Sequence, residues 1–219
     1  MLLDVIKGGY GFLELALAIV SYLLLVLVML PVHELAHAWM ATKLGDDTPR
    51  WHGRLTFNPF AHLDLWGTLM LVLFGFGYAK PVPVNPRNFR NPRRDMALVA
   101  LAGPLSNLLM AVLVLLLFRL LVFLMPASGT VLMIGATLVN IVAPINIGLA
   151  VFNLLPIPPL DGSRIFSAIL PSRWAFWMAQ HEHQIRILLI ILLATGALST
   201  PINFLASRVY QILLKVCVF

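Results

Sequence analysis

Charged residues are scarce in this chain of 219 residues, at 11% of the sequence. A soluble globular domain has about 25% charged residues. Hydrophobic residues make up 60%, so the chain lacks the polar side chains that a water-exposed surface needs. This scarcity excludes an ordinary soluble domain and predicts a protein whose main solvent is lipid.

Cysteine is nearly absent, since Cys217 is the only one. A single thiol excludes an internal disulfide and a cluster of thiolate metal ligands. The net charge of +6 does not come from a basic stripe, because the basic residues lie between apolar runs. Cytoplasmic loops of membrane proteins have this character, and we expect no nucleic-acid partner.

The chain contains several long runs of residues without a charge. A transmembrane helix needs about 20 apolar residues. The runs predict four spans, at about residues 10–43, 95–124, 129–155 and 184–200. We therefore expect an all-α polytopic membrane protein, and the length fits a single membrane-embedded domain over residues 1–219.

Two apolar segments do not fit a full span. Leu65 to Ala79 is too short to cross, and we expect a re-entrant or interfacial segment there. The tail from Ile202 carries Arg208 and Lys215 within apolar sequence. This tail either crosses the membrane or lies in the interface plane as an amphipathic helix, and we expect the interfacial helix.

Two short strings have strand character, RLTF at residues 54–57 and PVPV at residues 81–84. Proline limits the second to the edge of a sheet, and the proline-rich stretch 80–95 is expected to be an extended loop. We predict a β-hairpin here. Its exposed edge could accept an extended peptide, or the hairpin could simply cover a site.

The basic residues give the orientation. If the first span ends in the cytoplasm, eleven of them fall in cytoplasmic loops: Lys43, Arg50, Arg54, Lys80, Arg87, Arg90, Arg93, Arg94, Arg164, Arg173 and Arg186. Four fall on the other side: Lys7, Arg119, Arg208 and Lys215. Basic loops face the cytoplasm, so we expect a multi-pass protein of the cell membrane with its N-terminus outside. The first residues lack the basic cluster of a secretory signal peptide.

HELAH, at residues 33–37, carries the strongest chemical signal. Residues i and i+4 share one face of a helix, so His33 and His37 can bind one zinc ion while Glu34 activates a water molecule there. About 27 Å of helix, at about 1.5 Å per residue, precedes His33 from Leu15. Polar groups at that membrane depth are costly unless functional or paired. The alternative is a polar helix end that hydrogen-bonds to its neighbours.

Zinc needs a third protein ligand and an open position for water. The acidic residues after the motif are Asp46, Asp47, Asp64, Asp95, Asp161 and Glu182. Asp161 is the next-to-last residue of the segment NLLPIPPLDG, residues 153–162, where three prolines break the third span. A broken helix at membrane depth is tolerated when it lines a cavity, so this loop can bring a carboxylate to the metal. The alternative is an aspartate that caps the next short helix.

Four other histidines are weaker metal candidates. His52 and His62 flank GRLTFNPFA and could supply a fourth or transient ligand. A loop histidine more often hydrogen-bonds to the backbone. His181 and His183 flank Glu182 and could form a surface metal site, but we expect a solvated loop there.

With these motifs, the chain resembles the site-2 protease family of intramembrane zinc metalloproteases. HELAH fits the family's HExxH, and NLLPIPPLDG is similar to its NxxPxPxxDG, whose aspartate is the third zinc ligand and corresponds to Asp161. AGPLSN, residues 102–107, resembles the family's GxxxN element and brings in Asn107. GRLTFNPFAHLD and GYAKPVPVNPRNF look like the compact bacterial branch, without a PDZ or CBS domain. The resemblance covers about residues 20–200.

Four asparagines lie in apolar runs: Asn107, Asn140, Asn146 and Asn153. A buried amide could stabilise the oxyanion of a tetrahedral intermediate. It could equally form an interhelical hydrogen bond, which is the commoner case in membranes. For Asn107 and Asn153 we predict a catalytic or substrate-binding role, with the structural role left open.

The resemblance implies a zinc endopeptidase that hydrolyses peptide bonds within or near transmembrane segments of other membrane proteins. His33, His37 and Asp161 would bind Zn²⁺, and Glu34 would act as the base. The expected partners are a transmembrane protein substrate and membrane lipid. The alternative is a non-catalytic membrane protein, either a metal transporter or a pseudoprotease that only binds helices.

Overall fold

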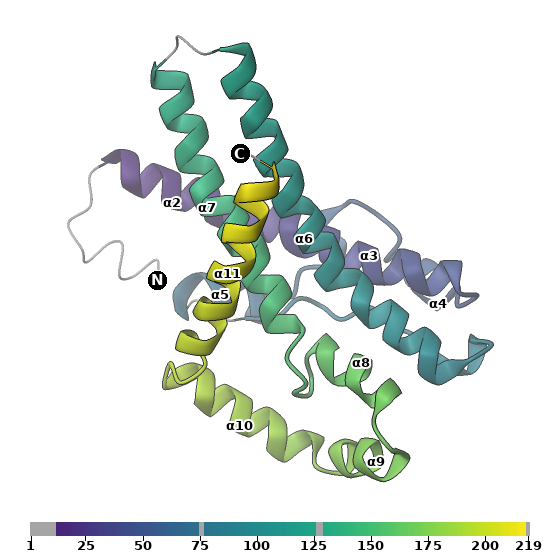
Figure 1. The fold of residues 1–219 in the computed structure, drawn as a ribbon. Coiled ribbons are helices and arrows are strands. Elements are labelled where there is room, and N and C mark those ends of the chain that lie inside the picture. Colours follow the sequence, from purple (N-terminus) through teal and green to yellow (C-terminus); the bar gives the residue numbers. More distant parts are fainter. Residues whose placement is uncertain (1–11, 75–76, 126–128, 218–219) are drawn as a thin grey trace.

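The computed structural model describes residues 12–74, 77–125 and 129–217, and within these ranges it contains helices and no strand. The first part contains α2 (Phe12–Leu24), the π-helical turn η1 (Leu25–Met29), α3 (Leu30–Lys43), α4 (Thr48–Trp51), the 3₁₀ turn η2 (Pro59–Ala61) and α5 (Leu65–Phe74). The second part contains the 3₁₀ turn η3 (Pro86–Asn88), α6 (Pro92–Leu124), α7 (Gly129–Asn153), α8 (Asp161–Ile169), α9 (Ser172–Gln180), α10 (Glu182–Ala194) and α11 (Ser199–Cys217) (Figure 1).

Three helical stretches are long and apolar enough to cross a membrane: Ile19–Lys43, Pro92–Leu124 and Gly129–Asn153. They confirm the first three predicted spans, although residues 10 and 11 of the first lie outside the described part of the chain. Helices suit this setting because they satisfy every backbone hydrogen bond internally where no water is available. The protein is therefore a multi-pass membrane protein.

The fourth predicted span, residues 184–200, is wrong in its boundaries. α10 has only 13 residues. It ends in a Schellman motif, in which Gly196 has a φ of 72° and the amide of Ala197 donates to the carbonyl of Leu192 at 3.1 Å. α11 then continues at an angle of 79°, so the two helices form either one broken span or a re-entrant loop. The described residues thus contain three candidate spans, or four if the bent pair α10–α11 is one span.

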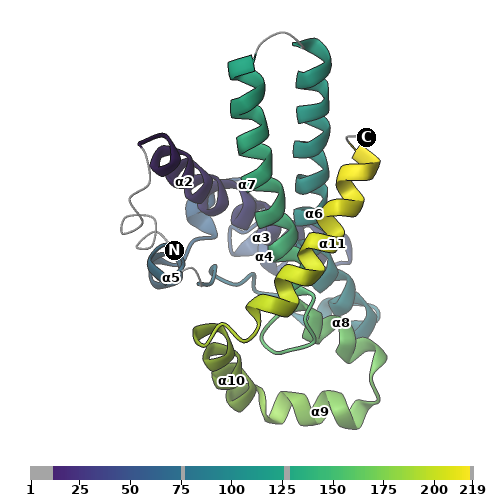
Figure 2. The ribbon, with the colours of Figure 1, turned by 60° about the vertical axis from the view of Figure 1, so that its left-hand side comes forward.

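The C-terminal helix α11 runs along the α6–α7 hairpin (Figure 2). Cys217 is buried in a core cluster with Leu115 of α6 and Ile147 of α7. The hydroxyl of Tyr210 donates to Oδ1 of Asn140 across the α11–α7 interface at 2.8 Å. The apolar face of this helix packs on the bundle, and its expected position in the interface plane stays a prediction.

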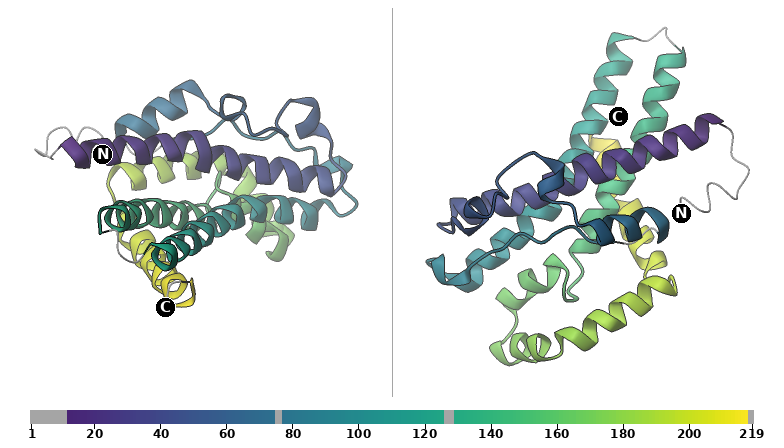
Figure 3. Two further views of the ribbon diagram at one scale, coloured as in Figure 1. Left: turned by 90° about the horizontal axis from the view of Figure 1, so that it is seen from above. Right: turned by 180° about the vertical axis from the view of Figure 1, so that it is seen from behind.

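The continuous stretch from α2 to α3 crosses the α6–α7 hairpin on the opposite side from α11 (Figure 3). The end of α3 packs against the first part of α6, where Ala41, Phe89 and Val99 are buried together. α8 packs against α6 as well. The three helices α3, α6 and α8 therefore meet in one region, which holds the candidate site.

The predicted β-hairpin is not present in the described residues, because neither 54–57 nor 81–84 forms a strand. The Arg54 guanidinium instead donates to the carbonyls of Ala61 at 2.6 Å and Lys80 at 3.1 Å. The amide of Lys80 donates to the carbonyl of His62 at 2.8 Å. A buried arginine thus joins the segments, and Pro81 and Pro83 cannot donate to a ladder.

The segment predicted to be re-entrant or interfacial, Leu65 to Ala79, contains α5. This helix has ten residues, about half of what a span needs. Residues 75 and 76 lie outside the described part of the chain. The prediction that this segment does not cross the membrane by itself is in line with this length.

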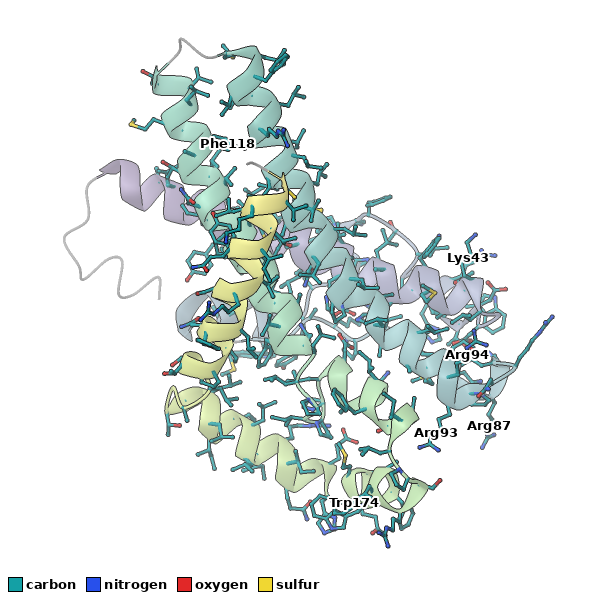
Figure 4. All side chains as sticks on the ribbon, viewed as in Figure 1. Lys43, Arg87, Arg93, Arg94, Phe118 and Trp174 are labelled. Atoms are coloured by element: carbon teal, nitrogen blue, oxygen red, sulfur yellow. The ribbon has the colours of Figure 1, made fainter. Side chains whose placement is uncertain are left out.

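The labelled basic side chains Lys43, Arg87, Arg93 and Arg94 gather where α3 ends and α6 begins, whereas Phe118 lies toward the other end of α6 (Figure 4). This placement follows the charge asymmetry of the sequence, because it collects basic residues at one end of the bundle.

Asp46 fastens the loop before α6 to the end of α3. Its side chain is fully buried. Its Oδ1 accepts hydrogen bonds from the Thr48 hydroxyl at 2.5 Å and from Nδ2 of Asn88 at 2.7 Å, and its Oδ2 accepts from the amide of Asn85 at 2.8 Å. Burial alone would raise the pKa of Asp46, but the donated hydrogen bonds outweigh burial and hold the pKa below its ordinary value.

Asp46→Asn should destabilise the protein by about 1–3 kcal/mol at pH 7, because an amide nitrogen would face buried donors. Since the folded-state pKa is lowered, the stabilisation is present above the ordinary aspartate pKa of about 3.9 and is lost as the pH falls below it. Thermal unfolding in micelles should show that the difference in unfolding temperature between the native protein and the variant becomes smaller below about pH 4. The neighbouring Asp47 is half-buried and paired with the exposed Arg50 at 3.4 Å, and it serves as the control because Asp47→Asn should change little. An equal effect from both variants would contradict the prediction.

Candidate metal centre

α3 places His33 and His37 one turn apart on one face. Both are buried, and their Nε2 atoms lie 3.0 Å apart. The π-helical turn η1 ends at Met29, four residues before His33. Pro31 has no amide hydrogen and would meet the carbonyl of Leu27 in a regular α-helix. The wider π turn accommodates this proline without ending the span.

Asp161 brings its carboxylate to these two imidazoles. Its Oδ2 lies 3.2 Å from Nε2 of His33 and 3.3 Å from Nε2 of His37. Asp161 is the first residue of α8, whose N-cap is Leu160, and no side-chain capping hydrogen bond is present there. The geometry thus disfavours the alternative in which this aspartate caps the helix.

The electrostatics of the cluster keep the aspartate ionised. Burial would raise the pKa of Asp161, but the two adjacent imidazoles outweigh burial, and its pKa lies below the ordinary value. A carboxylate ligand must be deprotonated to bind a metal ion. Asp161 therefore has the form that a ligand requires.

The distances within the cluster fit a tetrahedral ion. Zinc bound by nitrogen and oxygen at about 2.0–2.1 Å would hold its ligand atoms about 3.3–3.4 Å apart. The three separations here are 3.0, 3.2 and 3.3 Å. Within the ranges that the structure describes, His33, His37 and Asp161 form the one group of His, Cys, Asp or Glu residues arranged for a metal ion. Two imidazoles and a carboxylate suit zinc.

α6 lies against both imidazoles. Nδ1 of His37 lies 2.7 Å from the carbonyl of Val99. Nδ1 of His33 lies 3.1 Å from Nδ2 of Asn107. Between these contacts, Gly103 brings the backbone of α6 against the rings, where a Cβ atom would lie 2.4 Å from Nε2 of His37. Sequence reasoning missed Val99 and Gly103, although Gly103 stands four residues before Asn107 in AGPLSN.

Arg93, also missed, connects α6 to α8. Its Nε donates to the carbonyl of Ser167 at 2.9 Å, and its Nη2 donates to the carbonyl of Leu170. These carbonyls lie near the C-terminal end of α8, where a positive charge is favourable. The arginine thereby holds the helix whose first residue is Asp161. No pattern in the sequence indicated this contact.

Glu34 and three of the four asparagines predicted from the apolar runs lie outside the group of metal-binding residues. Glu34 is half-buried on α3, beside His33. Asn153 ends α7, and its Nδ2 donates to the carbonyl of Leu149 at 3.0 Å. Asn146 makes the same kind of bond to Val142. Asn140 is used in the contact with α11 described above.

The other histidines are not in the cluster. His52 and His181 have Nδ1 within 2.9 and 2.8 Å of the carbonyls of Thr48 and Trp177. Nε2 of the buried His62 lies 2.9 Å from the carbonyl of Thr56. These contacts are the backbone hydrogen bonds expected of loop histidines, and His183 is not part of the metal-binding group.

Comparison with known proteins gives a consistent set of matches. The profile of peptidase family M50 matches residues 21–137 and 122–195. The chain is 42% identical over 190 residues to "Putative zinc metalloprotease YwhC" of Bacillus subtilis, covering 84% of this chain and 85% of that protein. Two proteins named "Putative zinc metalloprotease Rip2" are 32% identical over 178 residues in Mycolicibacterium smegmatis, covering 79% of this chain and 66% of that protein, and 38% identical over 143 residues in Mycobacterium tuberculosis, covering 62% and 52%. No solved structure matches.

Proposed function

Because the chain belongs to peptidase family M50, the site-2 protease family, we propose that it is a zinc endopeptidase that cleaves other membrane proteins within or near their transmembrane segments. The observation that carries the proposal is the convergence of His33, His37 and Asp161 at ligand distances, next to Glu34. The polar cluster lies on a helix long and apolar enough to span a membrane.

The chemistry divides among the residues of the cluster. His33, His37 and Asp161 would hold the zinc ion, which when bound supplies a Lewis acid that makes water a nucleophile at neutral pH. Glu34 takes a proton from the attacking water. The same carboxyl group then passes the proton to the leaving amine nitrogen as the C–N bond breaks. Asn153, at the end of α7, is proposed to contact the substrate backbone with its remaining N–H.

The substrate has to reach this site in an extended form. In a transmembrane helix every amide is paired and no water is present, so the segment must unwind locally before hydrolysis. We place the site toward the cytoplasmic side of the cell membrane. The basic side chains at the junction of α3 and α6 support this orientation.

The test is cleavage of a single-pass membrane protein by the purified chain in micelles, before and after zinc removal by a chelator. Cleavage should fall to background without zinc and return when one equivalent is added. The cut should map to the transmembrane segment or its border by mass spectrometry. Asp161→Ala is the matched control, because it should bind zinc weakly and recover no activity upon zinc addition. Cleavage that persists without zinc, or at full strength in Asp161→Ala, would overturn the proposal.

A further inference from the structure

We propose that Asn107 is a positioning residue that accepts a hydrogen bond from Nδ1–H of His33 and so directs Nε2 of this histidine to the metal. The inference rests on the proposed function for the identity of the metal site. It differs from the oxyanion role predicted from the sequence, because Asn107 would act through His33 and not on the substrate.

One face of α6 lies against the histidines of α3. Val99, Gly103 and Asn107 are spaced by four residues and therefore lie on one face of the helix. Val99 meets His37 and Asn107 meets His33, so α6 and α3 run past each other in opposite directions at this point. Gly103 between them has no side chain to keep the helices apart.

Metal binding fixes which nitrogen of each imidazole carries the proton. A neutral histidine that binds a metal through Nε2 must carry its proton on Nδ1, and this N–H needs an acceptor. For His37 the acceptor is fixed, since the carbonyl of Val99, at 2.7 Å, cannot donate. Two histidines on one ion would each require such a partner. For His33, the side chain that lies next to Nδ1 is the amide of Asn107.

The orientation of the Asn107 amide decides which of its two polar atoms faces His33. Asn107 is only 1% exposed, and its Oδ1 has no hydrogen-bond partner, while its Nδ2 lies 3.1 Å from Nδ1 of His33. Half a turn of the amide exchanges the oxygen and the nitrogen. The oxygen then receives Nδ1–H of His33, which leaves Nε2 with its lone pair toward His37 and Asp161. Burial of the amide keeps solvent from competing for this contact.

The experiment measures zinc affinity in micelles by competition with a chromophoric chelator. Asn107→Leu keeps the shape but removes the acceptor, and it should bind zinc about 10–100-fold more weakly. Asn107→Asp keeps an acceptor oxygen and should stay within a few-fold of the native affinity. Asn146→Leu removes an equally buried amide that bonds only within α7, and it should bind zinc as the native protein does. Thermal unfolding confirms that each variant is folded.

Two outcomes would overturn the inference. One is native zinc affinity in Asn107→Leu, and if cleavage is then lost, the oxyanion role replaces positioning. The other is affinity in Asn107→Asp as weak as in Asn107→Leu, because then the acceptor is not what matters. These results do not depend on proteolysis. If the native protein binds zinc but cuts no substrate, the proposed function fails while the inference about Asn107 is still decided by zinc affinity.

Discussion

Glu34→Gln should lower the rate of substrate cleavage by about 10²–10⁴-fold while zinc content stays at the native level. Glutamine keeps the shape of the side chain but cannot take a proton from water. Glu34 is not in the group of residues arranged for the metal, so removing its charge should leave the ligands intact. The measurement is initial cleavage rate in micelles, with bound zinc determined on the same sample.

Glu182→Gln is the matched control. Glu182 lies on α10 and is paired with Arg186 at 2.6 Å on an exposed surface. An exposed pair of this kind contributes little to stability, so this variant should cleave at close to the native rate. If Glu34→Gln kept more than half of the native rate, Glu34 would not be the base, and a non-catalytic role for the chain would gain support.

Gly103→Ala should reduce both zinc affinity and cleavage by about 10–100-fold. The new Cβ would lie 2.4 Å from Nε2 of His37 and 2.6 Å from Cε1 of His33. Atoms cannot approach this closely, so either the rings or α6 must move. Overpacking of a tight interface also costs about 1–3 kcal/mol, and thermal unfolding should show that cost.

Gly148→Ala in α7 is the corresponding control, because a Cβ there would meet nothing within 4 Å. Alanine is the better helix former by up to about 1 kcal/mol, so this variant should be as stable as the native protein or more so. Zinc affinity should not change. If Gly103→Ala bound zinc as well as Gly148→Ala does, the close approach of α6 to the histidines would not matter for the site.

The membrane-spanning character of the chain could be predicted well because it depends on composition over long windows. The first three spans needed only uncharged runs of sufficient length. The fourth failed at Gly196, a single residue whose positive φ ends α10 inside an apolar run. Gly196 followed by Ser199 and Pro201 is a signal of a helix end that could have been used.

The β-hairpin failed for a different reason. RLTF and PVPV have strand-like composition, but strands need partners, and strand preference depends strongly on context. The side chain of Arg54 is buried instead and donates hydrogen bonds to two backbone carbonyls. Whether a side chain satisfies backbone groups in place of a neighbouring strand depends on how distant segments meet.

The sequence by itself determined the class of protein, the histidine pair and its glutamate, and, through the family resemblance, the aspartate expected to join them. His33 and His37 follow from the period of one helix, which local backbone geometry sets. The tertiary structure decided the rest. It carried Asp161 to 3.2 and 3.3 Å from the histidines and set the Val99 carbonyl and the Asn107 amide behind them. Such contacts join elements distant in the sequence, so they depend on how the helices pack and not on any local spacing.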